Sequence, residues 1–452
     1  MTGASTSTVT GALARWAAEL SFSDIPDEVA TVAEHGVLDT LAVTIAARNE
    51  PAVRILLDAS AGEFAPGESS LFDGSGRRVS AQAAALVNGT AAHAMDFDDM
   101  HPVMIGHPSA PLVPAVLALA EEYQASGADV ITALVAGYEV QVRIGAAGMP
   151  SHYLRGFHPT GTAATFGVAA AAGRLLGLDA DRLESALGIA GTQAAGLKSM
   201  FGTMSKPLHA GKAAANGIFA AKLAASGFTS SGDVLAAQQG FFATQTDGAD
   251  LEAVRAPFGQ PWHTLGLVVK LHAACGYTHA AIESMLAIRE QVRPSEVAAV
   301  DLLVNPELLS AANIYPPRTA LEAKFSVRWV TAMALARGSV AAADFTADVS
   351  HDAELLRLSR RISLTPDNDG RVPRLACIAT ARTRGGGELV VERDGALPLW
   401  REHPAEQSAR LRTKFASLVD PMIGERAGRF PELIAGLRSV TDVRSLIRTL
   451  AA

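Results

Sequence analysis

The sequence of 452 residues contains only two cysteines, Cys275 and Cys377. Two thiols cannot form a disulfide framework, and they cannot supply the three or four ligands of a thiolate zinc site. Basic residues are not in excess either, because 38 Lys and Arg face 46 Asp and Glu, for a net charge of -8. This balance argues against a general nucleic-acid binder and against a protein that binds anionic membranes. We therefore expect no nucleic-acid or membrane partner.

Long apolar runs are also lacking. Segments such as 166–173 are short and rich in Ala and Gly, well below the roughly 20 apolar residues that a membrane-spanning helix needs. The first twenty residues have no basic region followed by an apolar one, and Arg15 is their first basic residue. The sequence therefore predicts no signal peptide. Together with the low cysteine content, this predicts a cytoplasmic protein.

Hydrophobic residues make up 49% of the sequence and charged residues 19%, which is typical of a globular chain. From residue 9 to about 226, apolar residues recur at spacings of three and four, between interruptions by Gly, Pro or Asp. Ser109, Thr160 and Asp181 are the expected N-caps within this part. The pattern predicts helices near residues 8–20, 27–48, 80–94, 109–124, 128–147, 160–176, 181–196 and 208–226.

The pattern changes after about residue 264. Segments 297–304 and 362–365 predict strands, and 375–383 with 389–393 predict a hairpin across the turn at 384–387. Residues 405–450 return to helical spacing. We therefore expect a mainly α protein with a smaller α+β domain. The expected parts are a discontinuous helical domain of residues 1–264 and 401–452, and an inserted α+β lid domain of residues 265–400.

Histidine and lysine are unevenly distributed. Nine of the twelve His lie between His93 and His279, and the chain has only seven Lys against 31 Arg. Lys carries a compact, titratable ammonium group. Because the chain uses Arg so much more often, this usage suggests that its few lysines mark positions where such a group is needed; the alternative is that they lie by chance on solvated helix faces. Four of the lysines fall within one stretch: Lys198, Lys206, Lys212 and Lys222.

The sharpest local motif is residues 91–101, which contain His93, three aspartates (Asp96, Asp98 and Asp99) and His101. Asp and His are both metal ligands, but no second acidic cluster supplies the remaining ligands. The motif also matches the DxDD general acid of a terpene cyclase. The aromatic content of 6% argues against that class, because such enzymes stabilise carbocations with rings. A structural turn, in which Asp98 or Asp99 caps the next helix, is the third interpretation.

Other polar loops precede helices at 151–162, 201–209 and 270–279. His158 stands at the mouth of a Gly/Ala-rich helix, where exposed N–H groups attract anions. The sequence contains no phosphate loop, no GxGxxG after a strand and no GxSxG elbow. We therefore expect acid–base chemistry on a small anionic substrate, without metal or organic cofactor. Removal of a proton beside a carboxylate needs a base and nearby cations, and His107, His158, Lys206 and Lys270 suit these roles.

A cysteine nucleophile is an alternative to acid–base chemistry. Cys275 lies close in sequence to His272 and His279, either of which could activate it. A cysteine with apolar neighbours is more often a packing residue.

Five motifs occur in one order: His-Ala-Met-Asp-Phe-Asp-Asp at 93–99, Gly-His-Pro-Ser at 106–109, Gly-Phe-His-Pro-Thr at 156–160, Lys-Pro-Leu-His-Ala-Gly at 206–211 and Glu-Ala-Lys-Phe-Ser at 322–326. At these motifs the sequence resembles the MmgE/PrpD family, which includes 2-methylcitrate dehydratase, cis-aconitate decarboxylase and iminodisuccinate epimerase. The resemblance runs from about residue 12 to about residue 430. It implies a large helical domain, a smaller α+β lid domain, a homodimer, and a site between the domains without metal or organic cofactor.

Resemblance to the decarboxylase branch implies site residues in both parts of the chain. Two positions depart from that branch: Met100 stands where a Thr is common, and Cys275 stands where the decarboxylase has a His. Residues 102–104 and 152–154 look like the epimerase branch. The implied active-site residues are Asp96, His107, His158, Lys206, Lys270 and Tyr315, and we also expect substrate contacts from Tyr153, Thr160, His101 and Cys275.

These features predict a lyase of the dehydratase or decarboxylase type that acts on a small di- or tricarboxylate. In this hypothesis Lys or His removes a proton beside a carboxylate, His107 or His158 assists the leaving group, and Lys206 and Lys270 hold carboxylates. An epimerase with Tyr153 and Lys206 as opposed bases is the alternative within the family. A non-catalytic carboxylate-binding or scaffold protein is the alternative from another class.

Overall fold

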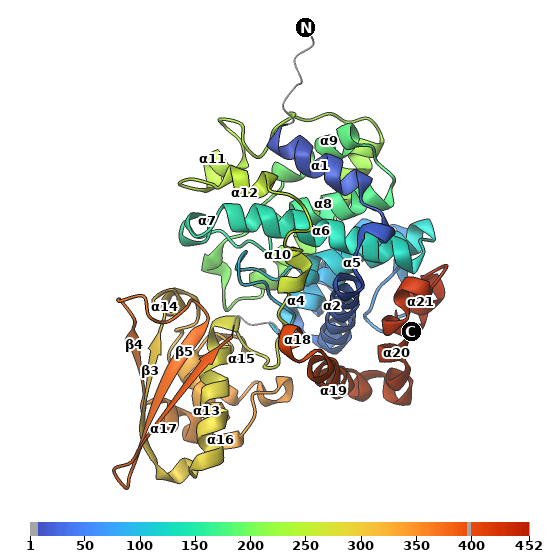
Figure 1. Ribbon diagram of the computed structural model, residues 1–452. Helices are drawn as coiled ribbons and strands as arrows, with labels where there is room; N and C mark the ends of the chain where they lie inside the picture. The colour runs from blue at the N-terminus through green and yellow to red at the C-terminus, as the bar shows by residue number, and fades with distance from the viewer. Residues whose placement is uncertain (1–7, 396–398, 452) are drawn as a thin grey trace.

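The computed structural model describes residues 8–395 and 399–451. The first seven residues, which belong to the segment predicted to lack a signal peptide, lie outside the described residues. Buried hydrophobic side chains form two main clusters. One joins residues 9–273 with 411–451, and the other joins residues 274–381 with Met100 and Tyr153. We call the corresponding parts the helical body and the α+β body; in Figure 1 the α+β body is the smaller one, at the lower left. The domain boundaries themselves remain a prediction.

The helical body contains the eight helices that the spacing predicted, each within a few residues of its expected bounds. Two C-terminal helices, α19 and α20, pack against α2, so the chain returns to the body in which it began. The helices are α1 Val9–Glu19, α2 Asp27–Ala46, α3 Pro51–Ala59, α4 Ala81–Ala94, α5 Ser109–Tyr123, α6 Gly127–Ala147, α7 Ser151–Leu154, α8 Ala163–Leu175, α9 Ala180–Gly191, α10 Ser205–Ala225, α11 Phe241–Gln245, α12 Leu251–Arg255, α18 Leu399–Glu402, α19 Pro404–Ile423, α20 Phe430–Ala435 and α21 Arg444–Ala451. A small antiparallel sheet joins β1 (Pro66–Ser70) to β2 (Arg78–Val79).

The predicted N-caps were wrong, because tertiary contacts use the side chains in other ways. Ser109 is the first residue of α5 rather than its cap, and its hydroxyl donates to Asp99. The Thr160 hydroxyl accepts the N–H of His107 at 3.0 Å, and α8 begins later, with Thr162 at the N-cap.

The start of α9 was also misplaced. The cap is Asp179 rather than Asp181, because the Asp179 carboxylate accepts the backbone N–H of Arg182. Asp181 lies in the first turn, where a negative charge interacts favourably with the helix dipole.

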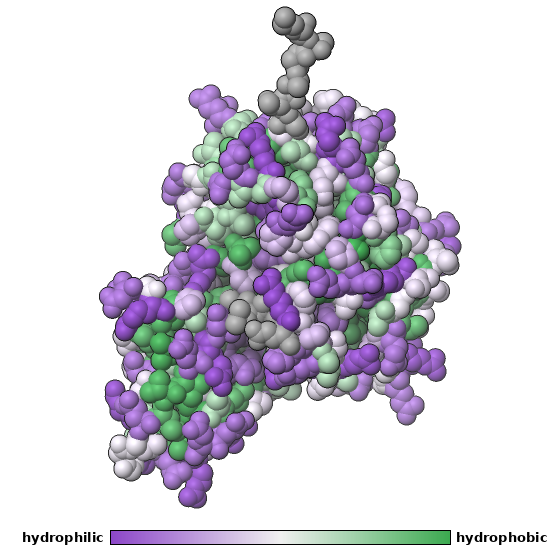
Figure 2. Space-filling model, viewed as in Figure 1, coloured by the Kyte–Doolittle hydropathy of each residue, from purple (hydrophilic) through white to green (hydrophobic). Residues whose placement is uncertain are grey.

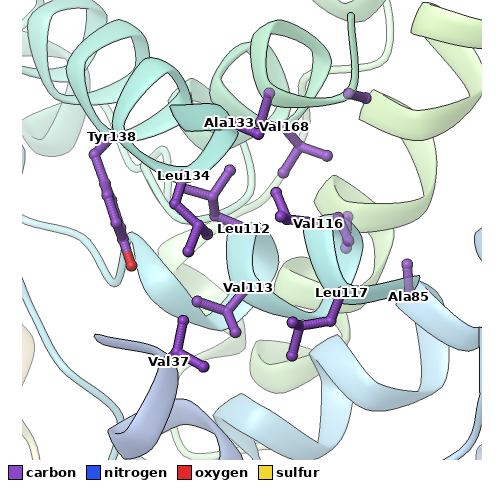
Figure 3. Close-up of a cluster of buried hydrophobic side chains, with 14 of the residues drawn as sticks. Val37, Ala85, Leu112, Val113, Val116, Leu117, Ala133, Leu134, Tyr138 and Val168 are labelled. Atoms are coloured by element: carbon purple, nitrogen blue, oxygen red, sulfur yellow. The ribbon is translucent and has the colours of Figure 1, made fainter. Parts of the chain in front are cut away.

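Helix α5 packs against neighbouring helices in the buried core of the helical body (Figure 3). Two helices, 27–49 and 127–147, are long and apolar enough to cross a membrane by length and composition, but 83% and 94% of their most apolar windows are buried inside the protein. Such burial is that of core helices. The close-up labels the side chains that α5 packs with its neighbours: Leu112, Val113, Val116 and Leu117 from α5, Val37 from α2, Ala85 from α4, Ala133, Leu134 and Tyr138 from α6, and Val168 from α8.

Glycines allow α4 and α10 to approach each other closely. A Cβ atom added to Gly211 would lie 2.2 Å from the carbonyl oxygen of Leu86, so only glycine fits there. The approach places the first turn of α10, which carries Lys206, beside the segment that follows α4. The small residues of the helical body therefore position one wall of the candidate site.

The α+β body contains a four-stranded sheet in the order β4-β3-β5-β6. The predicted hairpin is confirmed as the antiparallel pair β5 and β6, in which Ala379 lies opposite Val391, whereas β3 and β4 are parallel. Helices α13 and α16 pack against the sheet, and Figure 2 shows hydrophobic side chains gathered over this body. The strands are β3 Val297–Val304, β4 Ile362–Pro366, β5 Ala376–Thr383 and β6 Glu388–Asp394; the helices are α13 His279–Gln291, α14 Glu307–Ala311, α15 Ala320–Ala323, α16 Val327–Arg337 and α17 Ala353–Ser359.

Candidate active site

The segment between α4 and α5 carries most of the charged groups of the site. His93 lies in the last turn of α4, and the chain then passes through Asp96, Asp98 and His107 before α5 begins. Asp96 has a φ of 52°, in the left-handed region that residues other than glycine rarely adopt. Surrounding contacts must therefore hold this backbone in place.

Two buried ammonium groups share the carboxylate of Asp96. Lys206 Nζ donates to Asp96 Oδ1 at 2.6 Å, and Lys270 Nζ donates to the same oxygen at 3.0 Å and to the Asp96 carbonyl oxygen at 2.8 Å. Burial by itself would raise the pKa of Asp96, but the charges of Lys206 and Lys270 outweigh it and hold that pKa well below its usual value. Asp96 is therefore ionised, and the trio carries a net positive charge.

A second carboxylate, Asp98, orients two imidazoles. Asp98 Oδ2 lies 2.8 Å from His93 Nδ1 and 3.3 Å from His107 Nδ1. Burial would raise the pKa of Asp98, but the two histidines hold it well below its usual value, so Asp98 accepts from both rings. Burial lowers the pKa of His93 to about 3, and this ring is neutral with its proton on Nδ1.

His107 is held as a neutral base. Its Nδ1 lies 2.9 Å from the carbonyl oxygen of Asp99 as well as near Asp98, and both are acceptors, so Nδ1 carries the proton. Burial is the main cause that lowers the pKa of His107. The lone pair is therefore on Nε2, which lies 3.8 Å from Asp96 Oδ1. An imidazole with an oriented Nδ1–H and a free Nε2 is the arrangement of a general base.

A third imidazole completes this wall. His158 Nδ1 lies 3.0 Å from His209 Nδ1, so one nitrogen donates and the other accepts. Burial, together with the charge of Lys206, lowers the pKa of both rings. The ring centroid of His158 lies 5.7 Å from that of His93 and 6.4 Å from that of His107.

These groups border a cavity between the two bodies. It encloses about 490 Å³, open solvent at its mouth included, which is within the usual range for small-molecule sites. One wall is cationic and rich in imidazole, while the remaining walls are largely apolar and aromatic. The lining residues are Met100, His101, Pro102, Ile105, Gly106, His107, Tyr153, His158, Phe201, Lys206, Cys275, Gly276, Tyr277, Phe325, Arg374 and Leu375.

Two family models match this chain: the MmgE/PrpD N-terminal domain at residues 11–254 and the MmgE/PrpD C-terminal domain at residues 272–437. The chain belongs to the MmgE/PrpD family. It is 30% identical over 477 aligned residues to the cis-aconitate decarboxylase of Aspergillus terreus, with 98% of this chain and 96% of that protein covered. The cis-aconitate decarboxylase of Mus musculus is 29% identical over 363 residues, with 75% of this chain and 72% of that protein covered.

The structure brings together eight of the ten site residues that the sequence suggested. His101, His107, Tyr153, His158, Lys206 and Cys275 line the cavity, and Asp96 and Lys270 meet directly behind Lys206. Five residues from distant motifs therefore lie together in this MmgE/PrpD protein, while their catalytic roles stay a prediction: His107, His158, Lys206, Lys270 and Asp96. His101 makes a further contact, since its Nε2 lies 2.9 Å from the carbonyl oxygen of His263.

Two of the suggested residues do not line the cavity. Thr160 lies behind the wall and contributes through the backbone N–H of His107 that its hydroxyl accepts. Tyr315 is half-buried in the α+β body, where its hydroxyl lies 3.3 Å from that of Ser359 and the Arg328 guanidinium lies over its ring.

Several residues of the site were not among those that sequence reasoning selected, including Asp98, Tyr277, Phe325 and Arg374. Asp98 and Phe325 stand inside family motifs, so the motifs themselves were the available signal. Tyr277 donates its hydroxyl to Glu307 at 3.0 Å, and Arg374 pairs with the same carboxylate at 3.1 Å. This contact depends on tertiary structure, and the sequence around Arg374 carries no motif that marks it.

The two lysines on Asp96 disfavour a metal ion at this cluster. The ligand atoms of His93, Asp96, Asp98 and His107 all lie within 4.8 Å of one another, and these residue types can bind metals. However, Lys206 and Lys270 already occupy Asp96, so a divalent cation would face two ammonium groups at short range. A substrate carboxylate meets the opposite, favourable field.

Cys275 is unsuited to act as a nucleophile. Burial is the main cause that raises the pKa of its thiol to about 11, and a thiol that stays protonated is a poor nucleophile. The neighbouring histidines are engaged elsewhere: His272 Nε2 lies 2.8 Å from Glu283, and His279 Nε2 lies 3.2 Å from the carbonyl oxygen of Ala274. Cys275 therefore serves as a small apolar part of the cavity wall.

Proposed function

We propose that this chain is a cofactor-independent lyase that decarboxylates a small tricarboxylate of the cis-aconitate kind. The observation that carries the proposal is the Lys206 ammonium, hydrogen-bonded to Asp96, together with the His158 imidazole on one wall of a largely apolar cavity. The relatives named cis-aconitate decarboxylase support the same class of reaction.

The proposed chemistry uses both kinds of wall. Loss of CO2 leaves an electron pair on carbon, and this pair is stabilised when its charge spreads onto a second carboxylate. Lys206, which hydrogen-bonds to Asp96, would hold that second carboxylate and stabilise its growing charge. The carboxylate that leaves would face the apolar wall around Phe201 and Phe325, where a charged group is poorly solvated and neutral CO2 is not.

The new C–H bond needs a proton. His158 lines the cavity and contacts the less buried His209 through Nδ1, so the pair can pass a proton from the solvent side toward the substrate. A dehydration would use the same groups, with His107 Nε2 removing a proton beside a carboxylate and His158 protonating the departing hydroxyl. Both reactions therefore remain within one proposed class of lyase.

An epimerase with two opposed bases fits less well. Such a mechanism would need Tyr153 as the second base, but burial is the main cause that raises the pKa of this phenol well above its usual value. Tyr153 is therefore proposed as a hydrogen-bond donor to substrate. The proposal also includes a homodimer in the cytosol, which size-exclusion chromatography with light scattering and fractionation of cells would test.

The direct test is a screen of the purified protein against cis-aconitate, trans-aconitate, citrate, methylcitrate and iminodisuccinate in D2O, followed by proton NMR. We expect one acid to lose CO2 and to gain one deuterium in the product. Loss of water instead would assign the dehydratase branch. Deuterium at a stereocentre without loss of CO2 or water would reject the lyase and assign an epimerase.

Two variants make this test specific to the site. His158→Asn removes the proposed proton donor, whereas His403→Asn alters an exposed histidine that does not line the cavity. We expect turnover to fall by about 100-fold or more in His158→Asn and to stay unchanged in His403→Asn. Equal turnover in the two variants would reject the proposed site, and the absence of turnover with every acid in wild-type protein would reject the proposed function.

A further inference from the structure

Four of the seven lysines are buried, and they converge on three consecutive residues. Two of them, Lys206 and Lys270, hold the side chain of Asp96 as described above. The others hold the backbone on each side: Lys324 Nζ donates to the carbonyl oxygen of Met95 at 2.7 Å, and Lys414 Nζ donates to that of Phe97 at 2.6 Å. Lys270 Nζ holds the carbonyl oxygen of Asp96 between them, at 2.8 Å. Every carbonyl of residues 95–97 thus accepts from a lysine.

These lysines come from separate parts of the chain. Lys206 lies in the first turn of α10, Lys270 lies in the segment before α13, and Lys414 lies in α19 of the helical body. Lys324 follows α15 and belongs to the α+β body. The segment 95–97 therefore accepts hydrogen bonds from lysines of both bodies.

Burying an ammonium group is costly unless it gains strong partners. Lys414 has one in Asp39, at 2.6 Å. Lys324 differs, because among the described residues it forms no ion pair, and its ammonium hydrogen bond is to the Met95 carbonyl. Burial lowers the pKa of Lys324 to about 8, which records that cost. A methionine or leucine would fill such a position more cheaply, so packing alone does not explain a lysine there.

The backbone at Asp96 gives a reason. Its φ of 52° is unfavourable for an aspartate, and such conformations persist only where the surroundings over-determine them. This conformation directs the carboxylate toward Lys206 and Lys270 while the following residues carry Asp98 toward His93 and His107. A small rotation of residues 95–97 would misplace both carboxylates of the site.

We propose that Lys324 and Lys414 are positioning residues, which hold the carbonyls of Met95 and Phe97 so that Asp96 and Asp98 stay aligned with the lysines and imidazoles of the cavity. Because Lys324 belongs to the α+β body, the alignment depends on contact between the two bodies. The effect on turnover rests on the proposed function, but the effect on the Met95 carbonyl does not.

The Met95–Asp96 peptide can be observed alone, because Met followed by Asp occurs once in the sequence. Labelling with 13C-carbonyl methionine and 15N-aspartate therefore gives one HNCO signal, which reports the hydrogen bond that the Met95 carbonyl accepts. Lys324→Met removes this bond, and Lys212→Met, an exposed lysine on α10, is the matched control. We expect the signal to move in Lys324→Met and to stay in place in Lys212→Met.

Turnover supplies the second measurement. In Lys324→Met we expect kcat to fall about tenfold or more with KM within about threefold, because the variant disturbs groups that act in the chemical step and leaves the cavity lining intact. If Lys324→Met does not fold, titration of the wild-type signal above neutral pH replaces it, since loss of the Lys324 proton weakens the same bond. A signal that is unmoved in both experiments would overturn the proposal. A moved signal in a protein that turns over no carboxylate would retain it and reject the proposed function instead.

Discussion

Replacing Asp96 by asparagine tests the charge balance on which the site depends. The change keeps the size of the side chain and removes the negative charge that Lys206 and Lys270 share. At an effective dielectric constant of about 20, a pair of unit charges 3 Å apart is worth about 5 kcal/mol before desolvation is subtracted, and Lys270 Nζ lies 3.0 Å from Asp96 Oδ1. Removing one partner of a buried ion pair typically costs about 3–5 kcal/mol. We therefore expect Asp96→Asn to lower the free energy of unfolding by about 3–5 kcal/mol.

The assay is urea unfolding followed by tryptophan fluorescence, with a surface pair as the comparison. Glu122 pairs with Lys222 at 2.7 Å, and both side chains are about one third exposed. Glu122→Gln should cost at most about 1 kcal/mol, as exposed ion pairs do. The double variant Asp96→Asn/Lys270→Met should recover part of the lost stability, because it also removes a buried charge that no longer has a full partner.

Two results would refute this reasoning. If Asp96→Asn lowers the free energy of unfolding no more than Glu122→Gln does, the ammonium groups are not buried against the carboxylate. The second result concerns the double variant. If Lys270→Met costs as much stability in Asp96→Asn as it does in the wild-type protein, Lys270 does not depend on Asp96. Either result would remove the electrostatic basis of the proposed anion site.

Three further predictions concern individual groups. If the reaction is the dehydration, in which His107 is the base, the acid limb of kcat/KM should lie below pH 6.5, because burial lowers the pKa of His107 from 6.5; a limb at higher pH would exclude His107 as that base. Burial and the charge of Asp39 raise the pKa of Asp99 from 3.8 to about 8. Folded protein therefore retains a proton that unfolded protein loses, and the free energy of unfolding falls by several kcal/mol as the pH rises from about 4 to 8. Asp99→Asn should remove this pH dependence, as measured by thermal unfolding at pH 5 and pH 8. If the variant keeps the same pH dependence, the raised pKa of Asp99 is not its cause. Tyr315→Phe should change kcat/KM less than twofold in a steady-state assay, since Tyr315 does not line the cavity; a loss of tenfold or more would place it in the site.

Local pattern predicted the long elements well because burial in this protein follows helical spacing. The helix expected at 109–124 is α5, Ser109–Tyr123, and the strand expected at 297–304 is β3, Val297–Val304. The strand β1 was not predicted, because its sequence Pro-Gly-Glu-Ser-Ser has no alternation of apolar and polar residues. Tertiary contacts hold it in place: the Ser70 backbone N–H donates to Glu121 at 2.7 Å, and the Ser69 hydroxyl donates to the carbonyl oxygen of Ala118.

The residues of the candidate site fall into the same two groups, those that the sequence marks and those that only tertiary contacts place there. The motif residues His107, His158 and Lys206 could be selected from the sequence, because they stand in polar loops before helices of an Ala-rich chain, and the family resemblance added Asp96. Arg374 and Tyr277 could not, since they meet through Glu307 in the α+β body. Their place in the cavity wall follows from the packing of two bodies, which no local spacing encodes.

The sequence by itself determined the family, the helical character of most of the chain and the kinds of chemical group available to the site, because these follow from residue types and short spacings. The tertiary structure decided which groups meet. Lys206 and Lys270 reach Asp96 across 110 and 174 residues, and Lys324 reaches Met95 across 229. Contacts over such separations depend on how closely helices approach, as at Gly211 against Leu86, and on the burial that makes an ammonium group seek whichever oxygen the fold places beside it.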